Sequence, residues 1–151
     1  MRKLSLDLGT KSCGFAITDE SEIIASGLEN FKMDENDFQA VINKIKMYIN
    51  QYQIDGVILG YPLKISGQKS ERTLMVEQFA KLLEENFNIP YLFVNEQYTT
   101  KKAHEALISA GYTRAKRKLY KDKIAAVLIL QEYLDYYKQR KDIKWNYRKQ
   151  Q

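Results

Sequence analysis

LSLDLGTK (residues 4–11) is the stretch that decides the fold of this chain. It reads as a short apolar strand that carries one carboxylate, Asp7, and ends at Gly9 in a polar turn. A charge inside an apolar strand costs several kcal/mol unless a partner binds it. A metal ion, or a phosphate held through a metal, is the usual partner. Asp7 is therefore a candidate functional residue, although an Asp before Gly-Thr can also serve only as a turn former.

The composition indicates one globular domain of ordinary size. The chain has 151 residues, of which 44% are hydrophobic and 28% charged, and we assign residues 1–138 to a single domain followed by a basic polar tail, 139–151. No apolar run approaches the roughly 18 residues that span a bilayer, so no membrane partner is expected. One cysteine, Cys13, excludes an internal disulfide and a cysteine zinc cluster. A reducing, cytoplasmic location is the default for such a chain.

Hydrophobic periodicity predicts an α/β fold. The predicted elements are, in chain order, strands at 3–8, 14–18 and 23–28, a helix at 38–49, a strand at 56–60, a helix around 75–83, a strand at 89–94, a helix at 101–110, a basic loop at 112–121 and a last helix from about 122 to 138. The order βββ-α-β-α-β-α-α predicts a mixed five-stranded sheet with helices on both faces. Ligands of such sheets bind beyond the carboxyl ends of the strands.

Two further carboxylates occupy positions like that of Asp7. Glu96 directly follows the strand at 89–94, and Asp122 stands at the predicted head of the last helix. If the first and fifth strands are neighbours, Asp7 and Glu96 meet at one sheet edge and the last helix brings Asp122 over them. Three such carboxylates repel unless divalent cations bind, and Mg²⁺ or Mn²⁺ prefers oxygen ligands. The alternatives are a solvated strand end for Glu96 and a helix cap for Asp122.

The basic residues concentrate in the last third of the chain. Residues 1–97 hold 10 basic and 14 acidic side chains, a net charge of −4, whereas residues 98–151 hold 14 and 5, a net charge of +9. This asymmetry indicates nucleic-acid binding, or a solvated helix with a basic tail. We expect the tail to be disordered until it meets RNA or a ribosomal particle. The candidate phosphate contacts are Thr10, Lys11, Arg114, Lys116, Arg117, Lys118 and Lys121.

Four ordered blocks of sequence resemble the YqgF family, also called RuvX. The blocks are DLGTK with GFA (7–11 and 14–16), GYPL with Gly67 (60–63 and 67), Glu96 with Thr99, Thr100 and Ala103, and Arg117 with DKIAA (122–126) through LQ (130–131) and YLD (133–135). The resemblance covers residues 3 to about 135. It implies an RNase H-like fold and a metal-dependent phosphodiesterase with Asp7, Glu96 and Asp122 as its acidic triad. It also implies maturation of the 5′ end of 16S rRNA.

The chain departs from the family pattern beside two of these acids. Asn95 and Gln97 flank Glu96 where the family usually has an aspartate and an arginine, and Lys121 replaces a residue that is often apolar. These changes keep open a non-catalytic nucleic-acid-binding module. A Holliday junction resolvase acting on branched DNA is a further alternative, and it requires two active sites and thus a homodimer.

A nucleotide-binding kinase or ATPase is the rival class, because such domains also open on an Asp-x-Gly-Thr hairpin. They need a second lobe to enclose the nucleotide, for which 151 residues leave no room. The chain also has no Walker A pattern.

Overall fold

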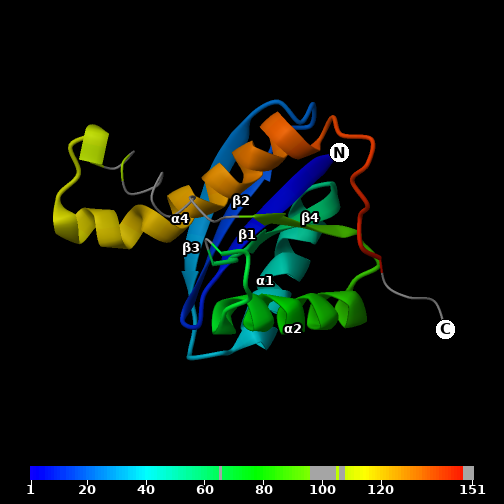
Figure 1. Cartoon of the computed structure of the whole chain (residues 1–151), viewed down its shortest axis with the longest axis horizontal. Coiled ribbons are helices and arrows are strands. Elements are labelled where there is room, and N and C mark those ends of the chain that lie inside the picture. Colours follow the sequence, from blue (N-terminus) through cyan, green and yellow to red (C-terminus); the bar gives the residue numbers. More distant parts are fainter. Residues whose placement is uncertain (65, 96–104, 106–107, 148–151) are drawn as a thin grey trace.

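The computed structural model describes residues 1–64, 66–95, 105 and 108–147, without the side chains of 118–123. A five-stranded sheet forms its centre, with the strand order β3-β2-β1-β4-β5 (Figure 1). The strands are β1 (Arg2–Leu8), β2 (Ser12–Thr18), β3 (Ala25–Lys32), β4 (Ile54–Tyr61) and β5 (Tyr91–Asn95). β1, β2 and β3 form an antiparallel meander, and β1, β4 and β5 run parallel. The predicted mixed sheet of five strands is confirmed.

The third strand starts later than the sequence predicts. A carboxylate oxygen of Asp19 accepts the backbone N–H groups of Ile23 and Ile24 at 2.7 and 2.9 Å, which holds this segment in a turn. Both isoleucine side chains are more than 60% exposed. The local hydrogen bonds of the aspartate therefore override the β propensity of the two isoleucines.

The carboxyl ends of the three parallel strands meet at one edge of the sheet. Leu59 of β4 pairs with Leu6 of β1 on one side and with Phe93 of β5 on the other. β4 thus lies between β1 and β5, so the condition that the first and fifth strands are neighbours is not met. β4 is added beside β1, and β5 is then added on the far side of β4. The two outer strands of the three lie two spacings apart, about 10 Å.

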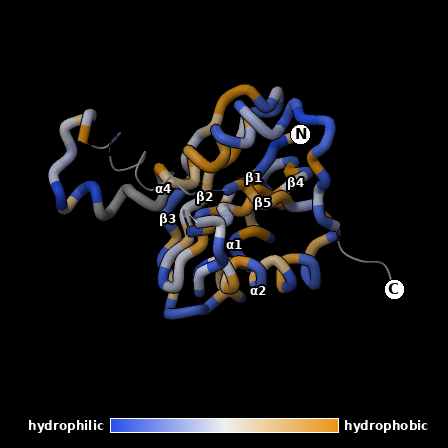
Figure 2. Tube along the Cα trace, viewed as in Figure 1, coloured by the Kyte–Doolittle hydropathy of each residue, from blue (hydrophilic) through white to orange (hydrophobic). Residues whose placement is uncertain are grey.

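Two capped helices cover one face of this sheet. The carboxylate of Asp37 accepts the N–H of Ala40 at the start of α1 (Phe38–Gln51). Ser70 and Thr73 form a reciprocal capping box at the start of α2 (Glu71–Asn86). Their apolar faces bury a core with the alternate leucines of β1, and Figure 2 shows hydrophobic residues along the sheet and the inner helix faces.

The last helix covers the opposite face and is longer than predicted. α4 (Arg114–Glu132) begins where Thr113 accepts the N–H of Lys116, and it ends in a π-helical turn, η1 (Tyr133–Tyr137). The predicted basic loop at 112–121 is therefore wrong from Arg114 onward, and Asp122 lies within the helix and not at its head. Arg, Lys, Ala and Leu are good helix formers, and no glycine or proline interrupts this segment.

The C-terminal tail packs on the sheet as far as Asn146. Ile143 and Trp145 pack against the core under α4, and Asn146 pairs with Tyr91 at the outer edge of β5. The expectation of a disordered tail is wrong for this part, because an indole and a β-bridge fix it. The predicted helix at 101–110 lies mostly outside the described residues. Within the described part of the chain, no helix is long and apolar enough to cross a membrane.

Candidate active site

Asp7 lies at the carboxyl end of β1 and is only 6% exposed. Side chains alternate along a strand. Leu6 and Leu8 therefore enter the core beneath α1 and α2, and Ser5 and Asp7 lie on the α4 face. On β2, Asp7 pairs with Gly14, which presents no side chain. The fold thus places one buried carboxylate at the edge where the parallel strands end.

A cation that the sequence analysis did not single out binds this carboxylate. The Nη2 atom of Arg72 donates to Oδ1 of Asp7 at 3.2 Å and to the backbone oxygen of Leu8 at 3.1 Å. The Asp7 side chain is 7% exposed and that of Arg72 is 45% exposed, so the pair connects the interior with solvent. The charge of Asp7 is therefore partly neutralised by Arg72. The sequence-based prediction had assigned this neutralisation to divalent cations alone.

A local signal for Arg72 exists in the sequence. Ser70 caps α2, so Arg72 falls in the first turn of this helix. A cation there opposes the helix dipole and costs about 0.3–1 kcal/mol at an exposed site. In this fold the ion pair with Asp7 offsets that cost for Arg72.

Asp122 lies on α4 toward the Asp7 end of β1. The hydroxyl of Ser5 donates to the backbone oxygen of Ala126 at 2.7 Å. Farther along, Tyr133 lines one small cleft with Lys3, so α4 runs antiparallel to β1. Asp122 comes one helical turn before Ala126, in the direction of Asp7. Its side chain is outside the described residues.

Glu96 lies outside the described residues as well. β5 ends at Asn95, which pairs with Tyr61 at the end of β4. Within residues 1–64, 66–95, 105 and 108–147, and leaving out the side chains of 118–123, no group of three or more His, Cys, Asp or Glu side chains could hold a metal ion. Among the three predicted metal ligands, only Asp7 has a described side chain. Its buried carboxylate supplies the oxygen ligand that Mg²⁺ or Mn²⁺ prefers.

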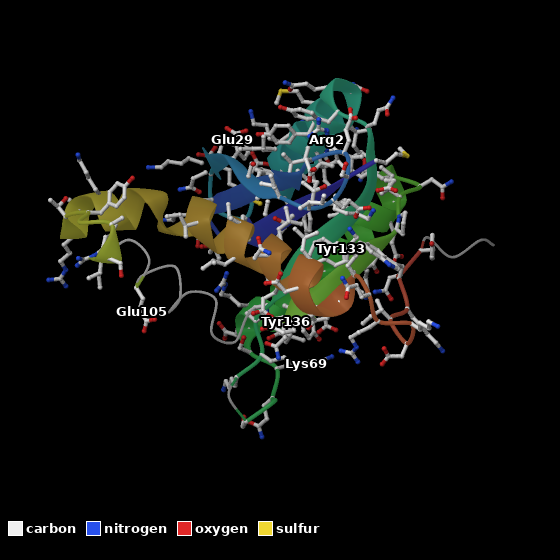
Figure 3. All side chains as sticks on the ribbon, turned by 90° about the horizontal axis from the view of Figure 1, so that it is seen from above. Arg2, Glu29, Lys69, Glu105, Tyr133 and Tyr136 are labelled. Atoms are coloured by element: carbon white, nitrogen blue, oxygen red, sulfur yellow. The ribbon has the colours of Figure 1, made fainter. Side chains whose placement is uncertain are left out.

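The predicted phosphate contacts fall into two separate groups. Thr10 and Lys11 are exposed in the β1–β2 turn beside the site. Arg114 and Lys116 are exposed at the start of α4, which extends beyond the sheet in Figures 1 and 3. Arg117 is half-buried, and its Nη1 donates to the backbone oxygen of Tyr112 at 3.5 Å. The side chains of Lys118 and Lys121 are outside the described residues.

A cleft adjoins the site on the α2 side. Its volume is about 520 Å³, within the range of about 300–1,000 Å³ usual for small-ligand sites. We call it the α2 cleft. It is lined by Thr10, Asn36, Phe38, Glu71, Arg72, Leu74, Met75 and Gln78.

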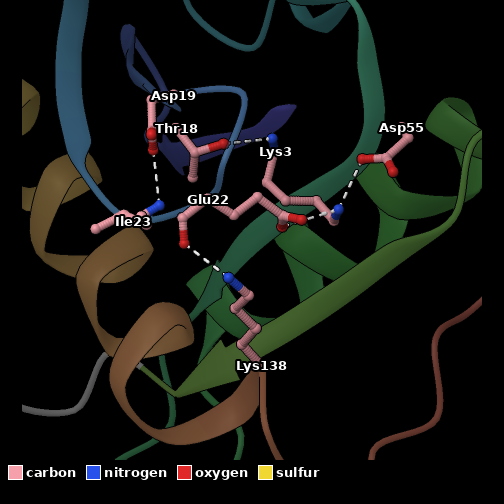
Figure 4. A network of polar contacts seen from close by, with 7 residues as sticks. All are labelled: Lys3, Thr18, Asp19, Glu22, Ile23, Asp55 and Lys138. Carbon is pink, nitrogen blue, oxygen red and sulfur yellow. Dashed lines mark hydrogen bonds and ion pairs between the residues drawn. The ribbon is translucent and has the colours of Figure 1, made fainter. Parts of the chain in front are cut away.

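The other buried charged residue of β1, Lys3, is paired with two carboxylates. Lys3, at the start of the strand, contacts Asp55 at 2.7 Å and Glu22 at 3.0 Å (Figure 4). Lys138, directly after η1, donates to the backbone oxygen of Glu22, and the Nζ atom of Lys3 lies 5.8 Å from the Trp145 ring centre. This network fastens the β2–β3 turn, β4 and the tail to β1.

Comparison with known proteins identifies the family. The family model described as "RuvX: Holliday junction resolvase" matches residues 1–136. The chain belongs to the RuvX family. The YqgF resemblance is thereby confirmed, and the match includes Asp7, Glu96 and Asp122 within its span.

Relatives of this RuvX chain cover nearly its whole length. Proteins named "Putative pre-16S rRNA nuclease" from Mycoplasmopsis pulmonis and Ureaplasma parvum serovar 3 are each 49% identical to it. The alignments cover 89% of this chain, and 93% and 96% of the relatives. A relative of the same name from Dictyoglomus thermophilum is 43% identical over 136 residues, covering 89% of this chain and 96% of its own.

Solved structures of resolvases share the fold. The fowlpox virus resolvase, in a complex with Holliday junction DNA, matches with a TM-score of 0.54 and 23% identity, over 89% of this chain and 97% of its own. Thermus thermophilus RuvC, also bound to a Holliday junction substrate, matches with a TM-score of 0.53 and 14% identity, over 88% and 94%. The predicted RNase H-like fold is confirmed by these neighbours.

Proposed function

We propose that this protein is a metal-dependent nuclease that hydrolyses phosphodiester bonds, and that it processes the 5′ end of pre-16S rRNA in the cytoplasm. The observation that carries the proposal is Asp7, a carboxylate 6% exposed at the carboxyl ends of three parallel strands. Membership of the RuvX family supports the reaction class. The names of relatives 43–49% identical support the rRNA substrate.

Asp7, Glu96 and Asp122 are the proposed catalytic residues and metal ligands. Asp7 is fixed by β1, Glu96 follows the last described residue of β5, and α4 carries Asp122 toward the same end of β1. A divalent cation, Mg²⁺ or Mn²⁺, would lower the pKa of a bound water and stabilise charge on the leaving oxygen. The chain's own part is to orient its carboxylates and to keep them at the sheet edge.

The basic side chains are proposed to bind the nucleic-acid backbone in two places. Thr10 and Lys11 lie beside Asp7, where they would contact phosphates next to the cleaved bond. Asp122 comes eight positions after Arg114 on α4, a rise of about 12 Å. Arg114 and Lys116, at the start of α4, would therefore contact phosphates farther along the substrate. Arg117, Lys118 and Lys121 would contact the phosphates between these and the site. Such contacts orient a substrate without reading its sequence.

Resolution of four-way DNA junctions is the second candidate function. The description of the matching family model favours it. Cutting a junction symmetrically needs two active sites, so this candidate requires a homodimer of the chain, whereas trimming an RNA end does not. Light scattering during size-exclusion chromatography, with and without junction DNA, distinguishes the two assemblies.

A paired cleavage assay tests the proposal. The protein is incubated with an RNA that spans a 16S 5′ end and with a four-way DNA junction, each in Mg²⁺ and in Mn²⁺. We expect metal-dependent cleavage of the RNA at a defined position. Cleavage of the junction alone would favour the second candidate. Binding of both without cleavage of either would show a non-catalytic module. The loss of cleavage would then be attributed to Asn95 and Gln97.

A further inference from the structure

We propose that the α2 cleft binds one unpaired nucleotide next to the cleaved phosphodiester, and that Arg72 is the positioning residue that joins the two sites. This inference rests on the proposed nuclease function and specifies its substrate class: a nucleic acid with an unpaired nucleotide at the cleavage position. Among the lining residues, Thr10 is the one that the cleft shares with the predicted carboxylate and phosphate sites.

The α2 cleft is continuous with the candidate active site through one side chain. Arg72 lines the cleft and donates to Asp7 at 3.2 Å. Its side chain is 45% exposed, so a ligand in the cleft can reach the guanidinium. A guanidinium carries five donors in a fork that suits phosphate oxygens. A nucleotide in the cleft would thus place its phosphate within reach of the group that orients Asp7.

The walls of the cleft are held in place by backbone contacts. The tight turn after β1 brings the N–H of Gly9 to the oxygen of Ser12 at 2.8 Å, and a Cβ at Gly9 would come within 3.1 Å of that oxygen. The backbone oxygen of Thr10, in this turn, accepts the N–H of Asn36 at 2.7 Å. The segment before α1 is thereby fixed to the β1–β2 turn. The cleft is consequently preformed, which lowers the entropic cost of binding.

The lining suits a base more than a second phosphate. Phe38 and Leu74 offer apolar surface, and Leu74 is 52% exposed although it is a large aliphatic residue. The Phe38 ring is held edge-on to Phe79 at 6.0 Å. Glu71 supplies a carboxylate, which repels phosphate but accepts hydrogen bonds from the amino groups of a base. The only arginine or lysine among the lining residues is Arg72, at the side nearest Asp7.

A nucleotide in this cleft has to be unpaired. At about 520 Å³ the α2 cleft has room for one base with its sugar, and a base that packs on Phe38 and Leu74 in this cleft has left the stack of its own helix. A paired base would have to leave its helix first, at a cost of a few kcal/mol, which is smallest for bases already single-stranded. The geometry thus selects single-stranded ends, bulges or branch points over continuous duplex.

The test compares two RNA hairpins that differ only in a short unpaired 5′ overhang, at low salt and with EDTA so that cleavage does not consume the probe. We expect the overhang hairpin to bind at least about 5-fold more tightly, since base stacking contributes roughly 1–3 kcal/mol. With 2-aminopurine at each overhang position in turn, the fluorescence should change sharply at one of them.

Variants assign this preference to the cleft. Arg72→Ala and Leu74→Ala should each reduce the preference to less than about 2-fold, and Arg72→Lys should restore part of it, because a lysine keeps the charge without the fork. Lys81→Ala, which removes an exposed charge of the same helix, and Met47→Ala, which removes an exposed apolar side chain of α1, are the matched controls and should bind as the unaltered protein does.

Equal affinity for the two hairpins, or an unchanged preference in both cleft variants, would overturn the inference. Cleavage is scored separately in Mg²⁺ and Mn²⁺. A protein that prefers the overhang but cleaves nothing supports the cleft and refutes the nuclease. A protein that cleaves RNA with no preference for the overhang supports the nuclease and refutes the cleft.

Discussion

The ion pair between Asp7 and Arg72 makes a measurable prediction about stability. Arg72→Ala removes a guanidinium 3.2 Å from a carboxylate that is 7% exposed. Removing one partner of a fully buried pair costs about 3–5 kcal/mol, whereas exposed pairs contribute about 0.2–1 kcal/mol. Because Arg72 is 45% exposed, solvent screens its charge. We therefore expect Arg72→Ala to lower the free energy of unfolding by about 1.5 kcal/mol.

A double-mutant cycle isolates the contribution of the pair. Asp7→Asn keeps the shape and one acceptor oxygen of the side chain but removes its charge. In that background, Arg72→Ala should cost only about 0.5 kcal/mol, which leaves a coupling free energy of about 1 kcal/mol. Urea unfolding in EDTA measures all four proteins without interference from cations. Lys81→Ala controls for the loss of one positive charge from α2.

Additivity within about 0.3 kcal/mol would refute this reasoning. It would mean that other groups compensate the charge of Asp7 and that Arg72 does not orient it. A coupling well above about 3 kcal/mol would contradict the solvent screening argued from the exposure of Arg72.

Three further predictions concern the tail, the β2–β3 turn and the basic end of α4. Trp145→Ala should lower the free energy of unfolding by about 2 kcal/mol. This is less than the roughly 3–5 kcal/mol lost when a fully buried tryptophan is truncated, because the indole is half-buried. An unchanged urea midpoint would contradict the packing of the tail. Hydrogen bonds from the backbone N–H groups of Ile24 and Ile23 hold the pKa of Asp19 below its usual value. The stability that the charged Asp19 gives to the fold is therefore present at neutral pH and is lost as the pH falls through its folded-state pKa. Asp19→Ala should therefore destabilise the protein in urea unfolding at pH 7 but not at pH 2, and equal losses at both would refute that assignment. Arg114→Ala and Lys116→Ala should each make the slope of log affinity for RNA against log salt concentration shallower by roughly 0.7–0.9, measured by fluorescence anisotropy between 50 and 200 mM salt. Unchanged slopes would show that the start of α4 does not contact the RNA.

Sequence reasoning located β1 and its carboxylate because one charge in an apolar strand is costly and therefore conspicuous. It also gave the sheet and the helices on both of its faces. It placed β5 beside β1 only as a condition, since the order of parallel strands depends on crossovers and not on any local pattern. β4 in fact separates the two strands.

The errors and omissions have separate physical causes. The segment from Arg114 was expected to be a loop because it is densely basic, yet its helix propensity and the Thr113 cap outweigh charge repulsion. Trp145 orders a tail that is polar on average, which composition alone cannot reveal. Arg72 is 65 residues from Asp7 in sequence, so only the folded structure shows their contact.

The central claim is that Asp7, Glu96 and Asp122 form one metal-dependent catalytic centre. The most direct measurement is the single-turnover rate of RNA cleavage, in Mg²⁺ and in Mn²⁺, for Asp7→Asn, Glu96→Gln and Asp122→Asn, with the exposed Asp135→Asn as the matched control. Loss of an outer-shell partner of a metal costs about 10–100-fold, so loss of a ligand should cost at least about 100-fold. We predict that decrease in all three variants with folding intact, and an unchanged rate in the control. Cleavage by Asp7→Asn at the rate of the unaltered protein, or cleavage that persists in EDTA, would contradict the account.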